Sequence, residues 1–190
     1  MKTLTNEDCS EWLASRKLLP DPYYSPKSRS PYCEQFPLAH HTRTIYPLFR
    51  SIVECVQPCE TALLHITDWA LYHPDEMAVT AHTRQAFGEH RPFIETPGYL
   101  FAAAERDLLI GLLALVTSYG WTASIYFEHG ITFLSWEGDL LDFYSPDSER
   151  YKAVCELMQH IGISSSATEN ANYTLQADGP HESQTSHPRR

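Results

Sequence analysis

The first candidate site is a group of histidine and carboxylate side chains near the middle of the chain. Five of them follow one another closely: His65, Asp68, His73, Asp75 and Glu76. They lie at the end of a predicted strand and in the turn after it, which is a common place for active-site residues. Imidazole and carboxylate groups bind metal ions or transfer protons. The pattern supports the hypothesis of a hydrolase or metal-dependent enzyme that uses the His65–Glu76 region, with His65, Asp68 and His73 as candidate catalytic residues.

Simpler explanations compete with this hypothesis. The spacing matches no zinc motif such as HExxH. Asp75 and Glu76 follow Pro74 at a predicted helix start, where carboxylates face the positive end of the helix dipole, and His65 fits a packed strand position. The chain has five cysteines but no CxxC pair, and it lacks GxSxG, P-loop and GxGxxG motifs. The sequence therefore favours a protein without enzymatic activity and predicts no bound metal and no cofactor.

A second group of carboxylates occurs later in the chain, among predicted strands and turns. Six are present without any lysine or arginine between them: Glu128, Glu137, Asp139, Asp142, Asp147 and Glu149. Complementary charge accelerates association and aromatic side chains dominate interface energies, so an acidic surface around a tryptophan suits a basic protein. The candidate partner-binding residues are Glu128, Trp136, Glu137, Asp139 and Asp142. The competing explanation is a solvated sheet edge whose charges oppose aggregation.

The distribution of charge and hydrophobicity excludes several classes of protein. The formal net charge is −10, and residues 40–163 hold 16 acidic side chains against 7 basic ones, so a phosphate-rich nucleic acid is not an expected partner. No apolar run reaches the roughly 18–20 residues of a membrane span. The acidic start, MKTLTNEDCSEW, lacks the apolar segment of a signal peptide, so a cytoplasmic location is expected. The oligomeric state is not determined by the sequence.

The elements that must position these side chains are clearest between residues 96 and 144. Residues 103–119 predict a buried helix, because leucine, isoleucine and valine surround its middle, and Gly111 is expected to allow another backbone to approach. Period-two alternation then predicts strands at 121–127, 131–136 and 140–144, joined by short turns. The fold class expected is α+β, with an antiparallel meander sheet packed against this central helix and flanking helices.

The remaining segments complete one domain with two appendages. Helical spacing predicts flanking helices at 45–56 and 74–87 and a last helix ending near residue 161, and TALLHITDW (61–69) predicts a central strand. The helix at 74–87 has a thin apolar face, consisting of Met77, Ala81 and Phe87, and is expected to lie on the surface. The organisation predicted is a proline-rich arm over 1–39, a single α+β domain over 40–163 and a disordered polar tail over 164–190.

Several short motifs follow one another along about residues 60–145: LLHITDW (63–69), RxxFGEHRP (84–92), PGYLF (97–101) and a leucine-rich helix ending in YGW (119–121). Together they resemble the motifs of a group of uncharacterised small soluble bacterial proteins. In that group the hairpin often leads into a turn containing serine, histidine and aspartate. The corresponding LSWEGD (134–139) has no histidine, so the resemblance implies a fold and supplies no activity.

Two functional hypotheses follow from the sequence. The first is a cytoplasmic, non-enzymatic protein-interaction domain that binds a basic partner, as an acidic immunity-type protein binds a basic toxin. The second is the hydrolase or metal-dependent enzyme that would use the His65–Glu76 region.

Overall fold

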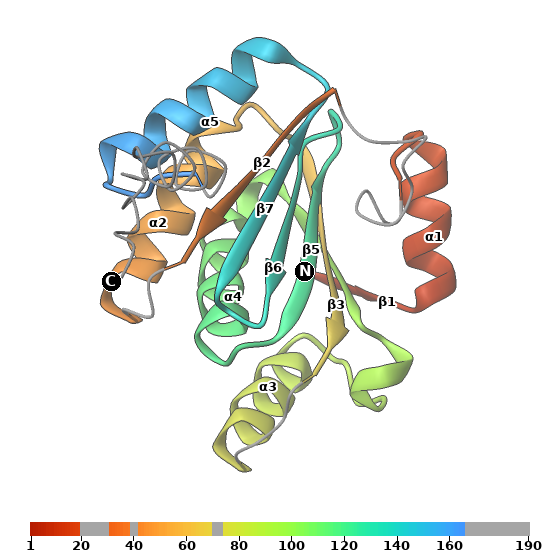
Figure 1. The fold of residues 1–190 in the computed structure, drawn as a ribbon. Coiled ribbons are helices and arrows are strands. Elements are labelled where there is room, and N and C mark those ends of the chain that lie inside the picture. The colour runs from red at the N-terminus through yellow and green to blue at the C-terminus, as the bar shows by residue number, and fades with distance from the viewer. Residues whose placement is uncertain (20–30, 39–41, 70–73, 166–190) are drawn as a thin grey trace, which may run out of the picture.

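Seven strands form one antiparallel sheet in the order β1-β4-β3-β5-β6-β7-β2 (Figure 1). The computed structural model describes residues 1–19, 31–38, 42–69 and 74–165. The strands are β1 (Lys2–Leu4), β2 (Tyr32–Pro37), β3 (Thr61–Asp68), β4 (Gly98–Ala102), β5 (Thr122–Phe127), β6 (Thr132–Trp136) and β7 (Leu140–Ser145). Strands β5, β6 and β7 are the predicted meander, and the α+β fold expected from the sequence is confirmed.

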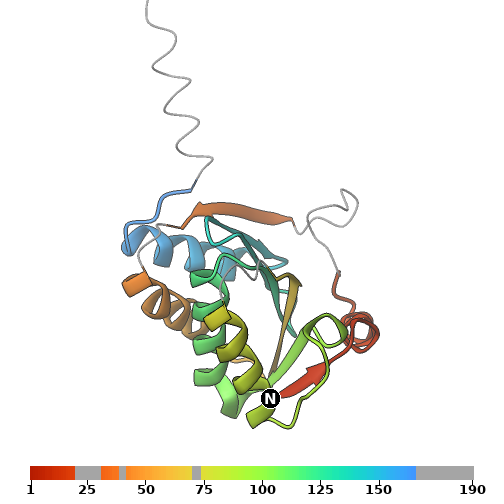
Figure 2. The same cartoon turned by 90° about the horizontal axis from the view of Figure 1, so that it is seen from below.

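Three helices cover one face of the sheet: α2 (Thr42–Cys55), α4 (Arg106–Ser118) and α5 (Ser148–His160) (Figures 1 and 2). Their apolar side chains pack against alternate residues of the strands, among them Leu64 of β3 and Phe133 of β6. Helix α4 follows a 3-10 turn, η2 (Ala103–Glu105), and is the buried central helix that the leucine-rich segment predicted. Among the described residues, none of the helices combines the length and apolar character that a membrane-spanning segment needs.

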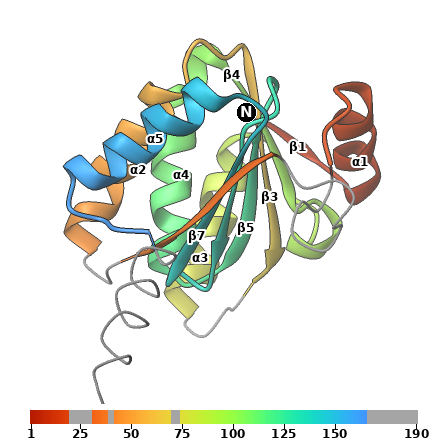
Figure 3. The ribbon, with the colours of Figure 1, turned by 45° about the horizontal axis from the view of Figure 1, so that its top comes forward.

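The opposite face of the sheet is covered in part by α1 (Asn6–Ser15), which Figure 3 shows apart from the other helices. Thr5 caps this helix: the backbone N–H of Asp8 donates to its hydroxyl at 3.1 Å, while the Asp8 carboxylate accepts from the Thr5 N–H at 3.0 Å. Trp12 and Leu13 then pack on Leu63 and Tyr126 of the sheet. The central strand β3 is therefore covered on both faces.

Residues 1–39 were expected to form an arm, but the described part of this segment supplies two strands of the sheet. β1 pairs with β4, and β2 pairs with β7, so these two segments form the two edges of the sheet. Pro31 precedes β2 and Pro37 is its last residue; an edge strand tolerates proline because one row of its N–H groups needs no partner strand. Most of the tail predicted to be disordered, residues 166–190, lies outside the described residues.

Helix α3 (Pro74–Ala86) turns polar residues toward the rest of the fold. Its buried residues are Glu76, Thr80 and Arg84, which are spaced by four and so share one face. Met77 and Phe87, which belong to the thin apolar face in the sequence, are 48% and 44% exposed. The apolar face therefore points largely outward, and the inward-facing Arg84 contacts the ring of Phe93.

A comparison of two glycines tests the packing of the sheet and of α4. Among the described residues, no heavy atom outside the helix's own backbone lies within 4 Å of the position that a β-carbon on Gly111 would occupy, so the close backbone approach expected there is wrong. We expect Gly111→Ala to raise the free energy of unfolding by up to about 1 kcal/mol, because alanine has the higher helix propensity. Urea denaturation measures this change.

The same substitution at Gly98 is expected to have the opposite sign. Gly98 in β4 faces β1, and an added β-carbon would overlap the sulfur of Cys9. Gly98→Ala should therefore lower the free energy of unfolding by about 1–3 kcal/mol, the usual cost of overpacking. Equal effects of the two substitutions would contradict the packing described for α1 and α4.

Candidate functional site

The structure describes two of the three candidate catalytic residues of the first group, His65 and Asp68. The His65 Nε2 atom lies 3.0 Å from the Asn6 side-chain oxygen of α1, and burial lowers the pKa of this histidine, which favours its neutral form. Asp68 is exposed at the end of β3, past a register shift that follows Ile66. His73 lies outside the described residues. Within those residues, no three His, Cys, Asp or Glu side chains converge on a point where they could hold a metal ion.

The second group of carboxylates is divided between the two ends of the meander. Glu128 follows β5, and its carboxylate accepts hydrogen bonds from the Glu60 N–H at 2.7 Å and the Thr61 hydroxyl at 3.0 Å. Burial works to raise the pKa of Glu128, but these hydrogen bonds outweigh it and hold the pKa below its usual value. Glu128 therefore anchors the start of β3. Glu137 and Asp139 lie at the other end of β6, a strand of about 16 Å at the usual rise per residue.

Asp142 is a buried carboxylate that orients an aromatic side chain. It is 4% exposed and lies in the middle of β7, between Leu134 of β6 and Gln35 of β2. One of its oxygens accepts from the Trp136 indole N–H at 2.8 Å, and the other accepts from the Gln35 side-chain amide at 2.7 Å. The carboxylate thus holds the indole and the amide on one face of the sheet.

Four of the five predicted partner-binding residues consequently belong to one surface, which we call the Trp136 surface. It comprises a hollow of about 320 Å³, together with Asp142 beside it, and the hollow is lined by Gln35, Trp136, Glu137, Asp139 and Leu140. Glu137 and Asp139 are exposed in the β6–β7 turn, and Trp136 is half-buried. Glu137 adopts a left-handed backbone conformation with φ of 46°, next to Gly138. The turn packs on the end of α4, since a β-carbon on Gly138 would press against the Thr117 carbonyl oxygen.

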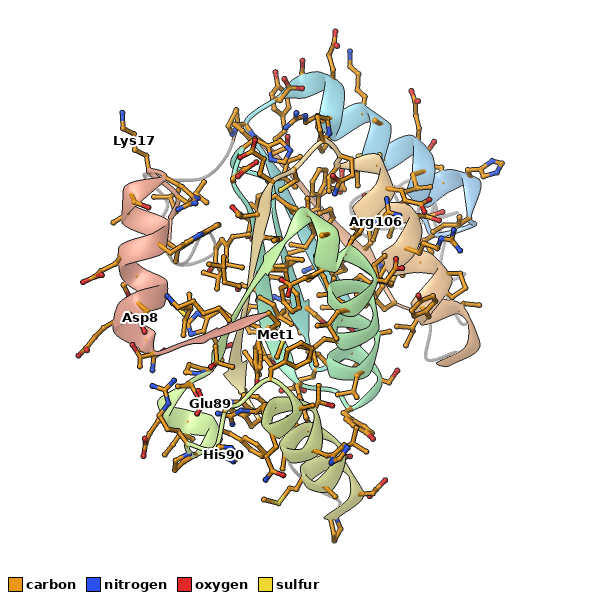
Figure 4. The ribbon with its side chains drawn as sticks, turned by 180° about the vertical axis from the view of Figure 1, so that it is seen from behind. Met1, Asp8, Lys17, Glu89, His90 and Arg106 are labelled. Atoms are coloured by element: carbon orange, nitrogen blue, oxygen red, sulfur yellow. The ribbon has the colours of Figure 1, made fainter. Side chains whose placement is uncertain are left out.

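A second hollow, which the sequence did not predict, lies beside α3. This α3 groove has a volume of about 380 Å³ and is lined by Met77, Ala81, Arg84, Gln85, Glu89, His90, Arg91, Pro92 and Phe93. It separates α3 from the segment that leads through η1 (Phe93–Glu95) to β4, and Figure 4 shows Glu89 and His90 next to each other in that segment. The one sequence feature that bears on this groove is the thin apolar face of α3, because a helix with few apolar residues turns polar residues inward.

Arg84 is a buried charged residue in the lining of the α3 groove. It is 1% exposed, and its Nη2 atom donates to the carbonyl oxygens of Arg91 at 3.0 Å and Pro92 at 3.4 Å, and to the Thr96 hydroxyl. The guanidinium carbon lies 4.7 Å from the centre of the Phe93 ring, a cation–π contact. Arg84 therefore fastens the segment after α3 to the helix.

A chain of aromatic rings continues from the Phe93 ring that contacts this buried cation. Trp69, which follows β3, stacks on Phe93 with ring centres 5.1 Å apart and meets Tyr99 edge-on at 6.5 Å. Burial raises the pKa of the Tyr99 hydroxyl to about 12, although the nearby Arg84 charge opposes this shift. Tyr99 therefore keeps its proton at neutral pH and is available as a hydrogen-bond donor.

Glu89 connects the α3 groove to the N-terminal strand. Its carboxylate accepts from the Arg91 backbone N–H at 2.7 Å, from Arg91 Nε at 2.9 Å and from the Thr3 hydroxyl of β1 at 2.6 Å. The Arg91 guanidinium, followed by the Thr3 hydroxyl and the Arg91 N–H, holds the pKa of Glu89 well below its usual value against the opposing effect of burial. The carboxylate consequently stays ionised throughout the neutral and mildly acidic range.

These contacts predict a pH-dependent contribution of Glu89 to stability. A carboxylate whose pKa is lower in the folded state stabilises the fold above its unfolded pKa of about 4.5, and the contribution is lost as the pH falls below that value. At pH 7 we expect Glu89→Gln to be less stable by about 1 kcal/mol, a modest value because Arg91 is half exposed and solvent screens the pair. Below pH 4.5 the difference from the wild type should shrink.

Thermal unfolding measured between pH 3 and pH 7 checks this expectation. Glu95→Gln is the matched control, because Glu95 is exposed in the same segment. A Glu89→Gln difference that stays constant across the whole pH range would contradict the proposed role of the ionised carboxylate.

Comparison of the chain with protein-family models, with curated proteins and with solved structures found no match. The resemblance of residues 60–145 to a group of small bacterial proteins therefore stays a prediction.

Proposed function

We propose that the chain is a protein-interaction domain that binds a basic protein through the Trp136 surface. The observation that carries the proposal is the pairing of Asp142 with Trp136: a buried carboxylate accepts from the indole N–H at 2.8 Å and so fixes the ring. A fixed aromatic side chain loses little conformational entropy on binding, which is why tryptophan is frequent among the residues that dominate interface energies.

Charge at the same place supports a basic partner. Glu137 and Asp139 are exposed at the hollow beside Trp136, and no lysine or arginine occurs between residues 128 and 149. The net charge of −10 extends the negative potential beyond this surface. Opposite charge steers a basic protein toward the surface and accelerates association, while the aromatic contact slows dissociation.

The enzyme hypothesis has weaker support. His65 forms its hydrogen bond with Asn6 of α1, and Asp68 is exposed three residues further along β3. No observation on the described residues brings these groups to a common substrate. The interaction hypothesis is therefore the one that the geometry favours.

A pair of charge-reversed variants tests the proposal. In Glu137→Lys/Asp139→Lys the surface loses its two exposed carboxylates, whereas Glu149→Lys/Glu156→Lys changes the net charge by the same amount on α5. A protein captured from an extract of the source cells by the wild-type chain is purified and its affinity measured for all three chains. We expect the Trp136-surface variant to bind at least about tenfold more weakly and the α5 variant to bind nearly as well as the wild type.

The dependence of the association rate on ionic strength is a second test of the same proposal. The association rate for the wild type should fall as salt is raised from 0.05 to 0.5 M, because screening removes the steering, and the Trp136-surface variant should show a weaker dependence. Equal losses of affinity in the two charge-reversed variants would show that net charge, and not the Trp136 surface, determines binding. Failure of the wild type to capture any partner at low salt would contradict the proposal.

A further inference from the structure

Unpartnered polar atoms occur in and next to the α3 groove. Within the described part of the chain, six buried side-chain nitrogen or oxygen atoms lack a hydrogen-bond partner. Two of the six, Arg84 Nε and Arg84 Nη1, belong to a residue that lines the groove. Two more, Thr80 Oγ1 and the Tyr99 hydroxyl oxygen, belong to residues behind that lining: Thr80 is one turn from Arg84 on α3, and Tyr99 is connected to Arg84 through the ring contacts of Trp69 and Phe93.

This arrangement is unfavourable unless something binds there. An arginine side chain stays protonated in proteins, so its charge cannot be removed by a shift of pKa. Buried charges are normally paired, yet within the described residues no carboxylate pairs with Arg84, whose partners are carbonyl oxygens, a hydroxyl and an aromatic ring. Neighbouring Arg91 is already neutralised by Glu89. Within the described residues, Arg84 is therefore a buried positive charge without a counter-ion.

We propose that the α3 groove binds a small organic carboxylate, whose anionic group pairs with Arg84 and accepts hydrogen bonds from the hydroxyls of Thr80 and Tyr99. Three residues would then donate to one anion, as in sites built for charged ligands. The proposal is independent of the partner expected at the Trp136 surface.

The lining of the groove selects this class of ligand. Its volume of about 380 Å³ is at the lower end of the range for small-molecule sites, and Met77, Ala81 and Phe93 provide apolar walls for the body of the ligand. A single negative charge balances Arg84. A doubly charged phosphate would lie close to the Glu89 carboxylate, which also lines the groove, so a monoanion is favoured.

The cation already lines the groove, and a flexible side chain stands in the same wall. Arg84 is 1% exposed, whereas Met77 is 48% exposed and unbranched, so it adapts to a ligand with little strain. His90 is exposed at the rim, next to Glu89 (Figure 4). No proton transfer or covalent step is required for binding.

Isothermal titration of the full chain with three probes tests the proposal. Benzoate carries the carboxylate on an apolar ring, benzamide has nearly the same shape without charge, and phenyl phosphate carries a second negative charge at neutral pH. We expect benzoate to bind saturably and to raise the melting temperature, and benzamide to bind at least about tenfold more weakly, as expected when a charged hydrogen-bonding group is lost.

Two isosteric variants distinguish a binding site from a structural cluster. Tyr99→Phe and Thr80→Val each remove one unpartnered hydroxyl and keep the shape of the side chain. Without ligand, both variants should be as stable as the wild type or more stable, because an unsatisfied buried group is deleted. With benzoate, each should lose about fivefold to tenfold in affinity. His82→Ala, which alters an exposed residue of α3 outside the groove, should bind as the wild type does.

Three results would overturn the assignment. Benzoate binding no tighter than that of benzamide would show that Arg84 does not pair with an anion. If Tyr99→Phe and Thr80→Val both bind benzoate with wild-type affinity, benzoate binds at a site that does not include these hydroxyls. Tighter binding of phenyl phosphate than of benzoate would exclude a site selective for a carboxylate.

Discussion

Burial of both faces of β3 is the constraint on which the arrangement of the other elements depends. Ala62, Leu64 and Ile66 point toward the helical layer, whereas Leu63 points to the opposite face. A sheet with helices on one side only would leave that second face in water at its centre. Helix α1 supplies the missing cover, and β1 brings it to the sheet by pairing with β4. The N-terminal residues are therefore part of the folded unit.

Both candidate sites lie at the end of the sheet where β3 finishes. Asp68 is paired with Thr122, and Ala123 with Ser135, so the β6–β7 turn lies at the same end as the start of α3. Polar groups at this end are held by contacts within the fold: Arg84 binds the carbonyl oxygens of the segment after α3, and Asp142 binds Trp136. These contacts make both hollows parts of ordered structure.

The carboxylates of this chain have different structural roles, which the net charge alone does not reveal. Glu128 caps the start of β3, Glu89 ties β1 to the segment after α3, and Asp142 orients an indole. Each is used inside the fold because a carboxylate accepts several hydrogen bonds at once. The exposed acidic surface at the meander is consequently smaller than the six carboxylates in the sequence suggested, and Glu137 and Asp139 are the ones that remain beside Trp136.

The sequence by itself determined the local elements, because their causes are local. Alternation predicted the meander, the leucine-rich segment predicted α4, and Pro74 with two acids predicted the start of α3. The tertiary structure decided the pairing of both edge strands, the side of α3 that faces inward and the division of the acidic residues. Those outcomes rest on contacts between distant residues, such as Gln35 with Asp142 over 107 positions and Thr3 with Glu89 over 86. No periodicity in a single chain encodes such pairs, and so Trp136 was predicted as a site residue while Arg84, Thr80 and Tyr99 were not.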